Sequence, residues 1–201
     1  MSKILYLASK SASRKMLLQK AGIQFQILEQ DADESQCDWG MPLHKVVESI
    51  ALHKMNHVIM PPGKEGQIAF VVTADTLSVD TTGAIRGKPV DKADALNMLH
   101  NARGTNNLCG TAFCLDKKIY QAGQWHTQKR IQGYAQALYT FDIPDSCIDD
   151  YIRHAEALNA AGAIKIEDGA QFVQTINGSY TAIVGLPMFE LWQALREIGF
   201  Y

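Results

Sequence analysis

The residues best suited to chemistry are an aspartate and a lysine, Asp75 and Lys88. Asp75 follows a continuous apolar run, residues 70–74, which is typical of a strand buried on both faces. An unpaired carboxylate is costly to bury, so we expect Asp75 to project from the end of this strand into a cleft. Residues 80–83 indicate a turn that returns the chain and places Lys88 near Asp75. Such a pair suits metal-assisted chemistry on a phosphate, but it could equally be a salt bridge at the mouth of a hairpin.

Three serines, Ser9, Ser11 and Ser13, lie between a short apolar strand pattern at residues 3–8 and a helical pattern at residues 15–22. A strand, a hydroxyl-rich turn and a helix N-terminus form a common anion-binding arrangement, because the first N–H groups of the helix are free. Any one serine could simply be the helix N-cap. The three together with Lys10 and Arg14 favour contact with phosphate.

Glu34 and Lys54 are weaker candidates. Glu34 belongs to the acidic segment 31–34, which would ordinarily be a solvated turn and gains interest only because Asp75 needs a partner for a divalent cation. Lys54 lies beside the apolar face of a helix expected over residues 43–57. Its own context favours a surface lysine whose stem covers apolar neighbours.

The remaining elements predict an α/β protein. Further strands are expected at residues 25–28, 108–115, 118–122 and 129–138, so that the last three form a meander. Helices are expected at residues 91–101, from residue 145 onward, and after Gly185-Leu186-Pro187. Residues 161–169 indicate a loop with a short strand, and residues 177–180 a tight turn. With no repeat and no low-complexity linker, residues 1–201 are expected to form one domain.

Composition narrows the class of partner. The formal charge is −2 over 201 residues, which offers no general attraction to nucleic acid polymers or to an anionic membrane. No apolar run is long enough for a spanning helix, and the N-terminal segment has no secretory pattern. The four cysteines, Cys37, Cys109, Cys114 and Cys147, form no metal-binding or CxxC pattern and are expected to be reduced. We therefore expect a soluble, cytoplasmic protein.

Taken in order, these stretches resemble the Maf (septum-formation-inhibitor-like) family of nucleoside triphosphate pyrophosphatases. The resemblance covers nearly the whole chain. It is carried by Leu7-Ala8-Ser9-Lys10-Ser11 with Arg14, Asp33-Glu34, Ala51 with Lys54, Ala74-Asp75-Thr76 with Gly87-Lys88-Pro89, Ala161-Gly162-Ala163, Gly178-Ser179-Tyr180 and Val184-Gly185-Leu186-Pro187.

The resemblance implies a mixed, curved sheet with flanking helices, and two lobes around a central cleft. It also implies metal-dependent cleavage between the α- and β-phosphates of a nucleotide, with Mg²⁺, Mn²⁺ or Co²⁺ as the divalent cation, and frequently a homodimer. The preferred substrates would be pyrimidine or modified nucleoside triphosphates.

Site roles follow from the same resemblance. Catalysis is assigned to Asp75, Glu34 and Lys88, with Asp75 and Glu34 also binding the metal. Binding of the substrate is assigned to Ser9, Arg14, Lys54, Lys88 and Glu167.

Three segments depart from the family pattern. Ala12-Ser13 stands where Pro-Arg is usual, and residues 103–107, including Asn106-Asn107, replace a Ser-Gly-Arg-x-His segment. Further along, a lysine is missing at Ala160, an aromatic residue at Ile164, and a glutamine has become Glu167. A carboxylate at Glu167 would repel phosphates unless it binds metal or is offset by Lys165, so base preference or rate could differ.

Two other functions remain open from the sequence. These departures are compatible with a nucleotide-binding regulator of cell division that has little catalysis. A pyrophosphatase for deaminated purine nucleotides, which has a similar two-lobed shape, is the third interpretation.

Overall fold

The structure is a computed structural model that describes residues 3–201. Its strands are β1 (Leu5–Leu7), β2 (Phe25–Ile27), β3 (Ile68–Val79), β4 (Ile85–Arg86), β5 (Asn106–Gln121), β6 (Gln124–Phe141) and β7 (Val173–Gly178). Its helices are α1 (Ala12–Lys20), α2 (Leu43–Asn56), α3 (Lys92–Ala102), α4 (Asp145–His154), α5 (Tyr180–Val184) and α6 (Met188–Glu197). None of the helices in this range is both long and apolar enough to cross a bilayer.

One mixed sheet forms the centre of the molecule. Its strand order is β2-β1-β3-β5-β6-β7, and β4 pairs with the end of β3. Strand β1 runs parallel to β2 and β3, whereas each neighbouring pair in the series β3-β5-β6-β7 is antiparallel. The predicted α/β fold with a mixed sheet and flanking helices is confirmed.

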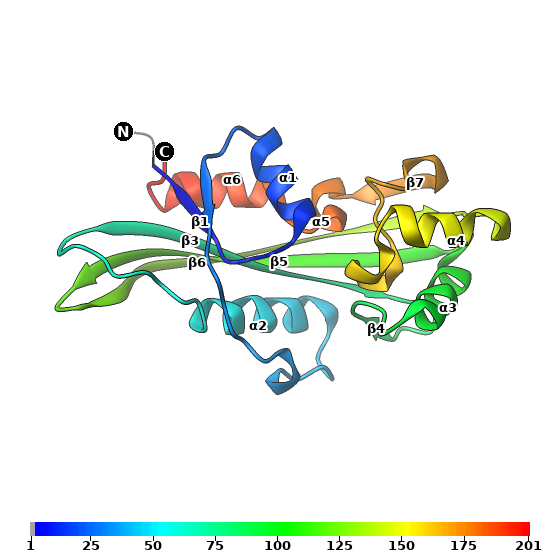
Figure 1. Ribbon diagram of the computed structural model, residues 1–201, viewed down its shortest axis with the longest axis horizontal. Helices are drawn as coiled ribbons and strands as arrows, with labels where there is room; N and C mark the ends of the chain where they lie inside the picture. Colours follow the sequence, from blue (N-terminus) through cyan, green and yellow to red (C-terminus); the bar gives the residue numbers. More distant parts are fainter. Residues whose placement is uncertain (1–2) are drawn as a thin grey trace.

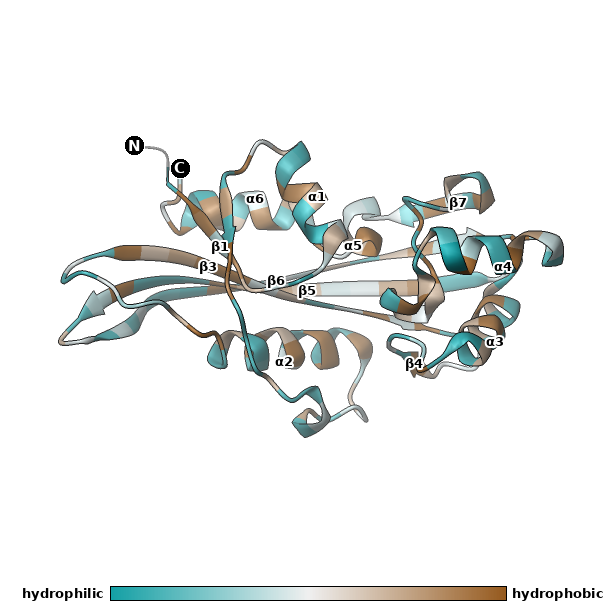
Figure 2. Ribbon diagram, in the orientation of Figure 1, coloured by the Kyte–Doolittle hydropathy of each residue, from teal (hydrophilic) through white to brown (hydrophobic). Residues whose placement is uncertain are grey.

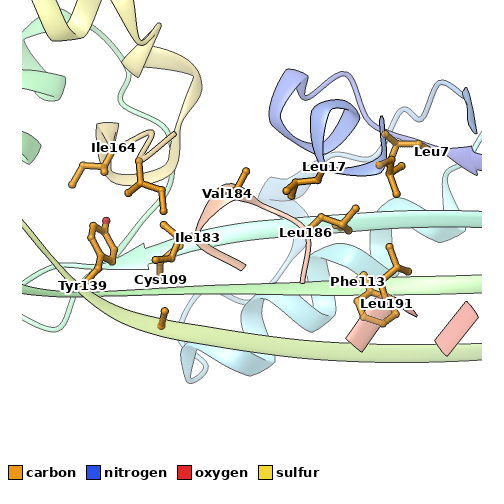
Figure 3. Packing of buried hydrophobic residues seen from close by; sticks show 14 of the residues in the cluster. Leu7, Leu17, Cys109, Phe113, Tyr139, Ile164, Ile183, Val184, Leu186 and Leu191 are labelled. Atoms are coloured by element: carbon orange, nitrogen blue, oxygen red, sulfur yellow. The ribbon is translucent and has the colours of Figure 1, made fainter. Parts of the chain in front are cut away.

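Helices cover both faces of this sheet. In Figure 1, α1, α5 and α6 lie on one side of the long strands and α2 lies on the other. Alternating teal and brown bands along α2 in Figure 2 reflect its amphipathic sequence, whose apolar side packs on β3 and β5. The larger core lies on the opposite face, where Figure 3 shows Leu7 of β1 and Leu17 of α1 gathered with Leu186 and Leu191 from the C-terminal part of the chain.

Strand β3 contributes to both cores because its side chains alternate between the faces. Phe70, Val72 and Ala74 face the larger core, and Val71 and Leu77 face α2. The prediction that Asp75 ends the strand is wrong: β3 continues to Val79, because β5 pairs with it along its whole length. An open edge, and not a strand end, gives Asp75 its cleft.

That open edge results from the short neighbours of β3. On this side, β1 pairs only with residues 70–72 and β4 only with residues 78–79. Within residues 3–201, no strand pairs with residues 73–77 on the same edge. The chain leaving β1 at Ala8 therefore passes next to Asp75 and Thr76, where a cleft can form.

Two other predicted elements differ. Residues 161–169 form no strand, because Gly162 adopts a left-handed conformation (φ 64°) inside a short 3₁₀ turn. Residues 177–180 are not a tight turn either: Gly178 ends β7, and the Ser179 side chain caps α5 by accepting a hydrogen bond from the N–H of Ala182.

The expected meander is instead one long hairpin, β5–β6, with its turn at Ala122-Gly123. The strands predicted at residues 108–115 and 118–122 are one strand, which continues through Asp116. Asp116 is fully buried (0% exposed), yet its oxygens accept hydrogen bonds from Arg130 Nε and Nη2 at 2.7 and 2.8 Å. Lys118 Nζ, two residues further along β5, lies 2.9 Å away, so a cross-strand ion pair from Arg130 and a same-strand one from Lys118 balance the charge of Asp116 within the continuous strand.

We predict that Asp116→Asn lowers the free energy of unfolding by about 3 kcal/mol at pH 7, because it leaves two cations without their shared carboxylate. Burial alone raises the pKa of Asp116, but Arg130 and Lys118 outweigh it and the net pKa lies below 3.8. This contribution is therefore present at neutral pH and is lost as the pH falls below 3.8.

Urea denaturation of wild type and variant between pH 7 and pH 3 measures the effect. The control is Asp150→Asn, which removes an exposed carboxylate paired with Arg153 and should change stability by less than about 0.5 kcal/mol. Equal effects of the two variants at pH 7 would contradict the assignment.

Candidate functional site

A cavity of about 830 Å³ opens along the uncovered edge of β3. It receives side chains from the β1–α1 turn, the segment before α2, α2 itself, β3, the loop after β4 and the loop after α4. All seven predicted site residues line it: Ser9, Arg14, Glu34, Lys54, Asp75, Lys88 and Glu167.

The innermost contact is a buried ion pair. Lys54 Nζ lies 2.6 Å from Asp75 Oδ1 and 2.8 Å from Glu34 Oε1, so one ammonium group holds both carboxylates. Interpreting Lys54 as a snorkelling surface lysine is wrong, because its side chain is buried with Asp75. The two acidic residues converge as expected, with a cation between them, because two like charges cannot be buried side by side uncompensated.

Local structure explains how this pair is positioned. Val47, Ile50 and Lys54 lie on the face of α2 that packs against the sheet. One turn before Lys54, the carbonyl of Ala51 accepts a hydrogen bond of 2.6 Å from Thr73 Oγ1. Thr73 and Asp75 lie on the same face of β3. This hydrogen bond therefore fixes the position of α2 along the strand, so that Lys54 meets Asp75.

Asp75 is only 5% exposed, and its pKa is raised above the ordinary value by burial, against the opposing charges of Lys54 and Arg14. Its second oxygen, Oδ2, is buried and accepts no hydrogen bond from any group within residues 3–201. A buried carboxylate oxygen without a partner is costly, and such an atom is a reason to expect a ligand.

Arg14 forms the second wall of the cavity. Its Nε donates to the carbonyl of Gly185 at 2.8 Å, Nη1 to Ser9 Oγ at 3.2 Å and Nη2 to Thr76 Oγ1 at 3.1 Å. Gly185 has φ 119°, a left-handed conformation that lets the chain turn here beside the guanidinium. Burial lowers the pKa of Arg14 from its ordinary value, against the charges of Asp75 and Glu34.

The serine turn caps α1 and also lines the cavity. Ser11 is the N-cap of α1, since its side chain accepts a hydrogen bond from the N–H of Arg14. Ser9 instead accepts from the Arg14 side chain and lines the cavity. The capping interpretation therefore accounts for Ser11, and Ser9 remains a candidate for ligand contact.

Glu167 reaches the cavity from the loop after α4, and a side chain of α1 forms a hydrogen bond with its carboxylate. Ser13 Oγ donates to Glu167 Oε1 at 2.6 Å. Lys165 does not offset this charge, because its Nζ pairs with Asp168 at 2.6 Å. Ser13 and Glu167, both departures from the family pattern, thus contact each other.

Lys88 lines the cavity from an exposed position and forms no ion pair with Asp75, whose cation is Lys54. The salt bridge at the mouth of this hairpin joins Arg86 Nε to Asp80 at 2.8 Å. Next to Lys88, the carbonyl of Gly87 accepts a hydrogen bond from the N–H of Gly162 at 2.9 Å. This bond connects the Lys88 segment to the loop that leads to Glu167.

Sequence reasoning gave no role to Thr76, Thr111 or Trp39. Thr76 and Trp39 line the cavity, and the Trp39 indole N–H donates to the carbonyl of Glu34 at 3.2 Å. Thr111 is buried behind Thr76. A hydroxyl inside the apolar segment 108–115 was the one available signal, but it does not say which partner the hydroxyl meets.

Among residues 3–201, no group of three or more His, Cys, Asp or Glu side chains is arranged to hold a metal ion. Two carboxylates that contact the same ammonium nitrogen are nevertheless close enough to share one hydrated ion. Mg²⁺ in proteins is commonly held by one or two carboxylates, with waters and substrate phosphates as its other ligands. The donor set, including the unpartnered Asp75 Oδ2, therefore fits such an ion.

Comparison with known proteins identifies the family of this chain. Residues 4–198 match the family model described as Maf-like protein. A dTTP/UTP pyrophosphatase of Geotalea uraniireducens is 36% identical and is aligned over 96% of this chain and 94% of its own. A dTTP/UTP pyrophosphatase of Hydrogenovibrio crunogenus is 34% identical over 100% and 99%, and one of Aromatoleum aromaticum is 31% identical over 98% and 96%. This chain therefore belongs to the Maf-like protein family.

Proposed function

We propose that this protein is a nucleoside triphosphate pyrophosphatase that hydrolyses the bond between the α- and β-phosphates, releasing a nucleoside monophosphate and pyrophosphate. The observation that carries the proposal is the unpartnered, buried Asp75 Oδ2 in a cavity that also contains Lys54 and Arg14. Pyrimidine nucleotides are the proposed substrates, because the relatives reported above are dTTP/UTP pyrophosphatases.

The cationic residues suit a polyphosphate. A guanidinium has five N–H donors, and three contacts hold Arg14, so two N–H groups remain for phosphate oxygens. Lys54 and Lys88 supply further positive charge from α2 and from the loop after β4, and Ser9 offers a hydroxyl. These groups neutralise the charge that builds up on the leaving pyrophosphate.

The acidic residues orient and deprotonate the attacking water. Asp75 Oδ2 has the capacity to accept a proton, and Glu34 shares the same ammonium partner. A divalent cation, Mg²⁺, Mn²⁺ or Co²⁺, held by Asp75 and Glu34 would supply charge neutralisation on the phosphates when bound.

The alternative, a nucleotide-binding regulator with little catalysis, draws its support from Glu167, whose carboxylate lies in the cavity without a cationic partner of its own. The other departure offered for it, Asn106-Asn107, has structural contacts. Asn107 donates to the carbonyls of Ala102 and Thr105, and Asn106 accepts from Thr140. We therefore favour the enzyme.

The setting of the reaction is part of the proposal. Free nucleotides in the cytoplasm, and not nucleic acid polymers or membranes, are the proposed partners. The net charge of −2 and the four free cysteines support this setting.

We expect pyrophosphate release from UTP and dTTP in the presence of Mg²⁺, Mn²⁺ or Co²⁺, and its loss on addition of a chelator. Asp75→Asn should lower kcat/KM by at least about a hundredfold, because it removes the proton acceptor and a metal ligand. A panel of eight nucleoside triphosphates, including those of inosine and xanthosine, also reports base choice.

The control for this experiment is Asp150→Asn, an exposed change on α4 that should leave turnover intact. Saturable nucleotide binding without turnover would support the regulator instead. Preference for inosine or xanthosine triphosphate would favour the deaminated-purine interpretation.

Glu167→Gln should lower KM for the preferred nucleotide, by up to about tenfold, because it removes a negative charge from the phosphate cavity at almost constant shape. Ser13→Ala is the matched variant: it frees the carboxylate but keeps its charge, so KM should not fall. An unchanged KM in Glu167→Gln would show that this carboxylate lies away from the bound phosphates.

A homodimer is also proposed. Its support is a set of exposed aromatic residues at the C-terminal end. Phe189 is 68% exposed, and Trp192 contacts Tyr201 with ring centroids 4.4 Å apart at an interplanar angle of 46°. Light scattering should give twice the chain mass of 22.2 kDa for wild type, and a single mass for Phe189→Glu combined with Trp192→Glu. A wild-type monomer at micromolar concentration would contradict the proposal.

A further inference from the structure

Behind Arg14, a line of hydrogen-bonding groups runs from the cavity wall into the interior of the protein. Arg14 Nη2 lies 3.1 Å from Thr76 Oγ1, which lies 2.8 Å from Thr111 Oγ1, which in turn lies 2.6 Å from the carbonyl oxygen of Ala182. The four residues come from α1, β3, β5 and α5. They therefore connect four separate elements through one buried polar chain.

The direction of each bond follows from the donors available. The carbonyl of Ala182 can only accept, so the single hydroxyl proton of Thr111 points to it. The proton between the two hydroxyls must then come from Thr76. Thr76 in turn accepts from the Arg14 guanidinium, which can only donate. Each hydroxyl thus donates one bond and accepts one, and no member can rotate without breaking a bond.

Thr111 is well placed to affect Arg14 without touching a ligand. It is 0% exposed and is not among the residues that line the cavity, whereas Thr76 is. Figure 3 shows the surrounding apolar packing, with Ile183 of α5 beside Cys109 of β5. This packing holds α5 against β5 independently of the hydroxyl.

Loss of the Thr111 hydroxyl would not leave the Ala182 carbonyl without a hydrogen bond. The Ala182 carbonyl also accepts a hydrogen bond from the N–H of Gly185 at 3.1 Å, so it keeps a partner. Thr76 would lose its acceptor and could turn its hydroxyl away from Arg14. A buried guanidinium depends on such partners for its orientation.

We propose that Thr111 is a positioning residue that fixes the Arg14 guanidinium, through Thr76, in the orientation that contacts the substrate phosphates. The inference rests on the proposed pyrophosphatase function. It assigns a kinetic role to a side chain that a ligand in the cavity does not reach.

The test compares Thr111→Val, which keeps the shape and removes the hydroxyl, with Thr111→Ser, which keeps the hydroxyl. We expect kcat for UTP to fall about tenfold in Thr111→Val and to recover to within about twofold of wild type in Thr111→Ser. The melting temperature of each variant is measured alongside. A wild-type kcat in Thr111→Val, or failure of Thr111→Ser to recover it, overturns the proposal.

A double-mutant cycle covers the case in which Thr111→Val folds poorly. Thr76→Val interrupts the chain from the other side, and Thr76→Val combined with Thr111→Val should be no slower than Thr76→Val alone. Multiplied losses in the double variant overturn the proposal. If Thr111→Val does not fold, Thr76→Val with and without Thr111→Ser is compared: serine at 111 should then have no further effect, and a further loss overturns the proposal.

Calorimetric binding of inorganic pyrophosphate separates this inference from the proposed function. If wild type hydrolyses no nucleotide, the proposed function fails. The positioning role of Thr111 is then tested by comparing the affinity of each variant for pyrophosphate with that of wild type. Thr111→Val should weaken that affinity severalfold and Thr111→Ser should not. Equal affinities, or no binding by wild type, overturn the inference.

Discussion

The buried contact between Lys54 and Asp75 is the constraint on which the rest of the structure depends. A carboxylate in the middle of an apolar strand is stable only if a cation is brought to it, and Lys54 lies 2.6 Å away on α2, the helix that packs on this face. The hydrogen bond from Thr73 to the carbonyl of Ala51 and the apolar side of α2 set this distance. Core packing and site geometry are thus the same set of contacts.

The cleft beside this ion pair exists because the strands β1 and β4 next to β3 are short. Because β1 stops after Leu7 and β4 pairs only at the end of β3, the edge at residues 73–77 is open to a ligand. The chain leaving β1 then starts α1, whose first turn carries Arg14 into the cavity. The cleft is therefore a consequence of strand length, and it brings the anion-binding turn beside the acidic residues.

The charges of the site alternate and are not separated into an acidic and a basic wall. Lys54 lies between two carboxylates, and Arg14 is held by neutral oxygens from Ser9, Thr76 and Gly185. Neutral partners leave the full positive charge of Arg14 available to phosphate, whereas a carboxylate partner would cancel it. The two buried cations thus differ in their partners: Lys54 is paired with carboxylates, and Arg14 with neutral oxygens.

Apolar periodicity, caps and motif order are local properties of the sequence. The α/β class, most of the helices, the buried strand with Asp75 and the candidate residues of the cavity could therefore be predicted from it. Only the tertiary structure decided the partners: Lys54 with Asp75, Ser13 with Glu167, Lys165 with Asp168. It also showed that Asp116 could be buried inside one continuous hairpin, because Arg130 reaches it from the neighbouring strand β6 and Lys118 from its own strand. Charge pairing depends on which distant segments meet, and a linear pattern of residues carries no record of that.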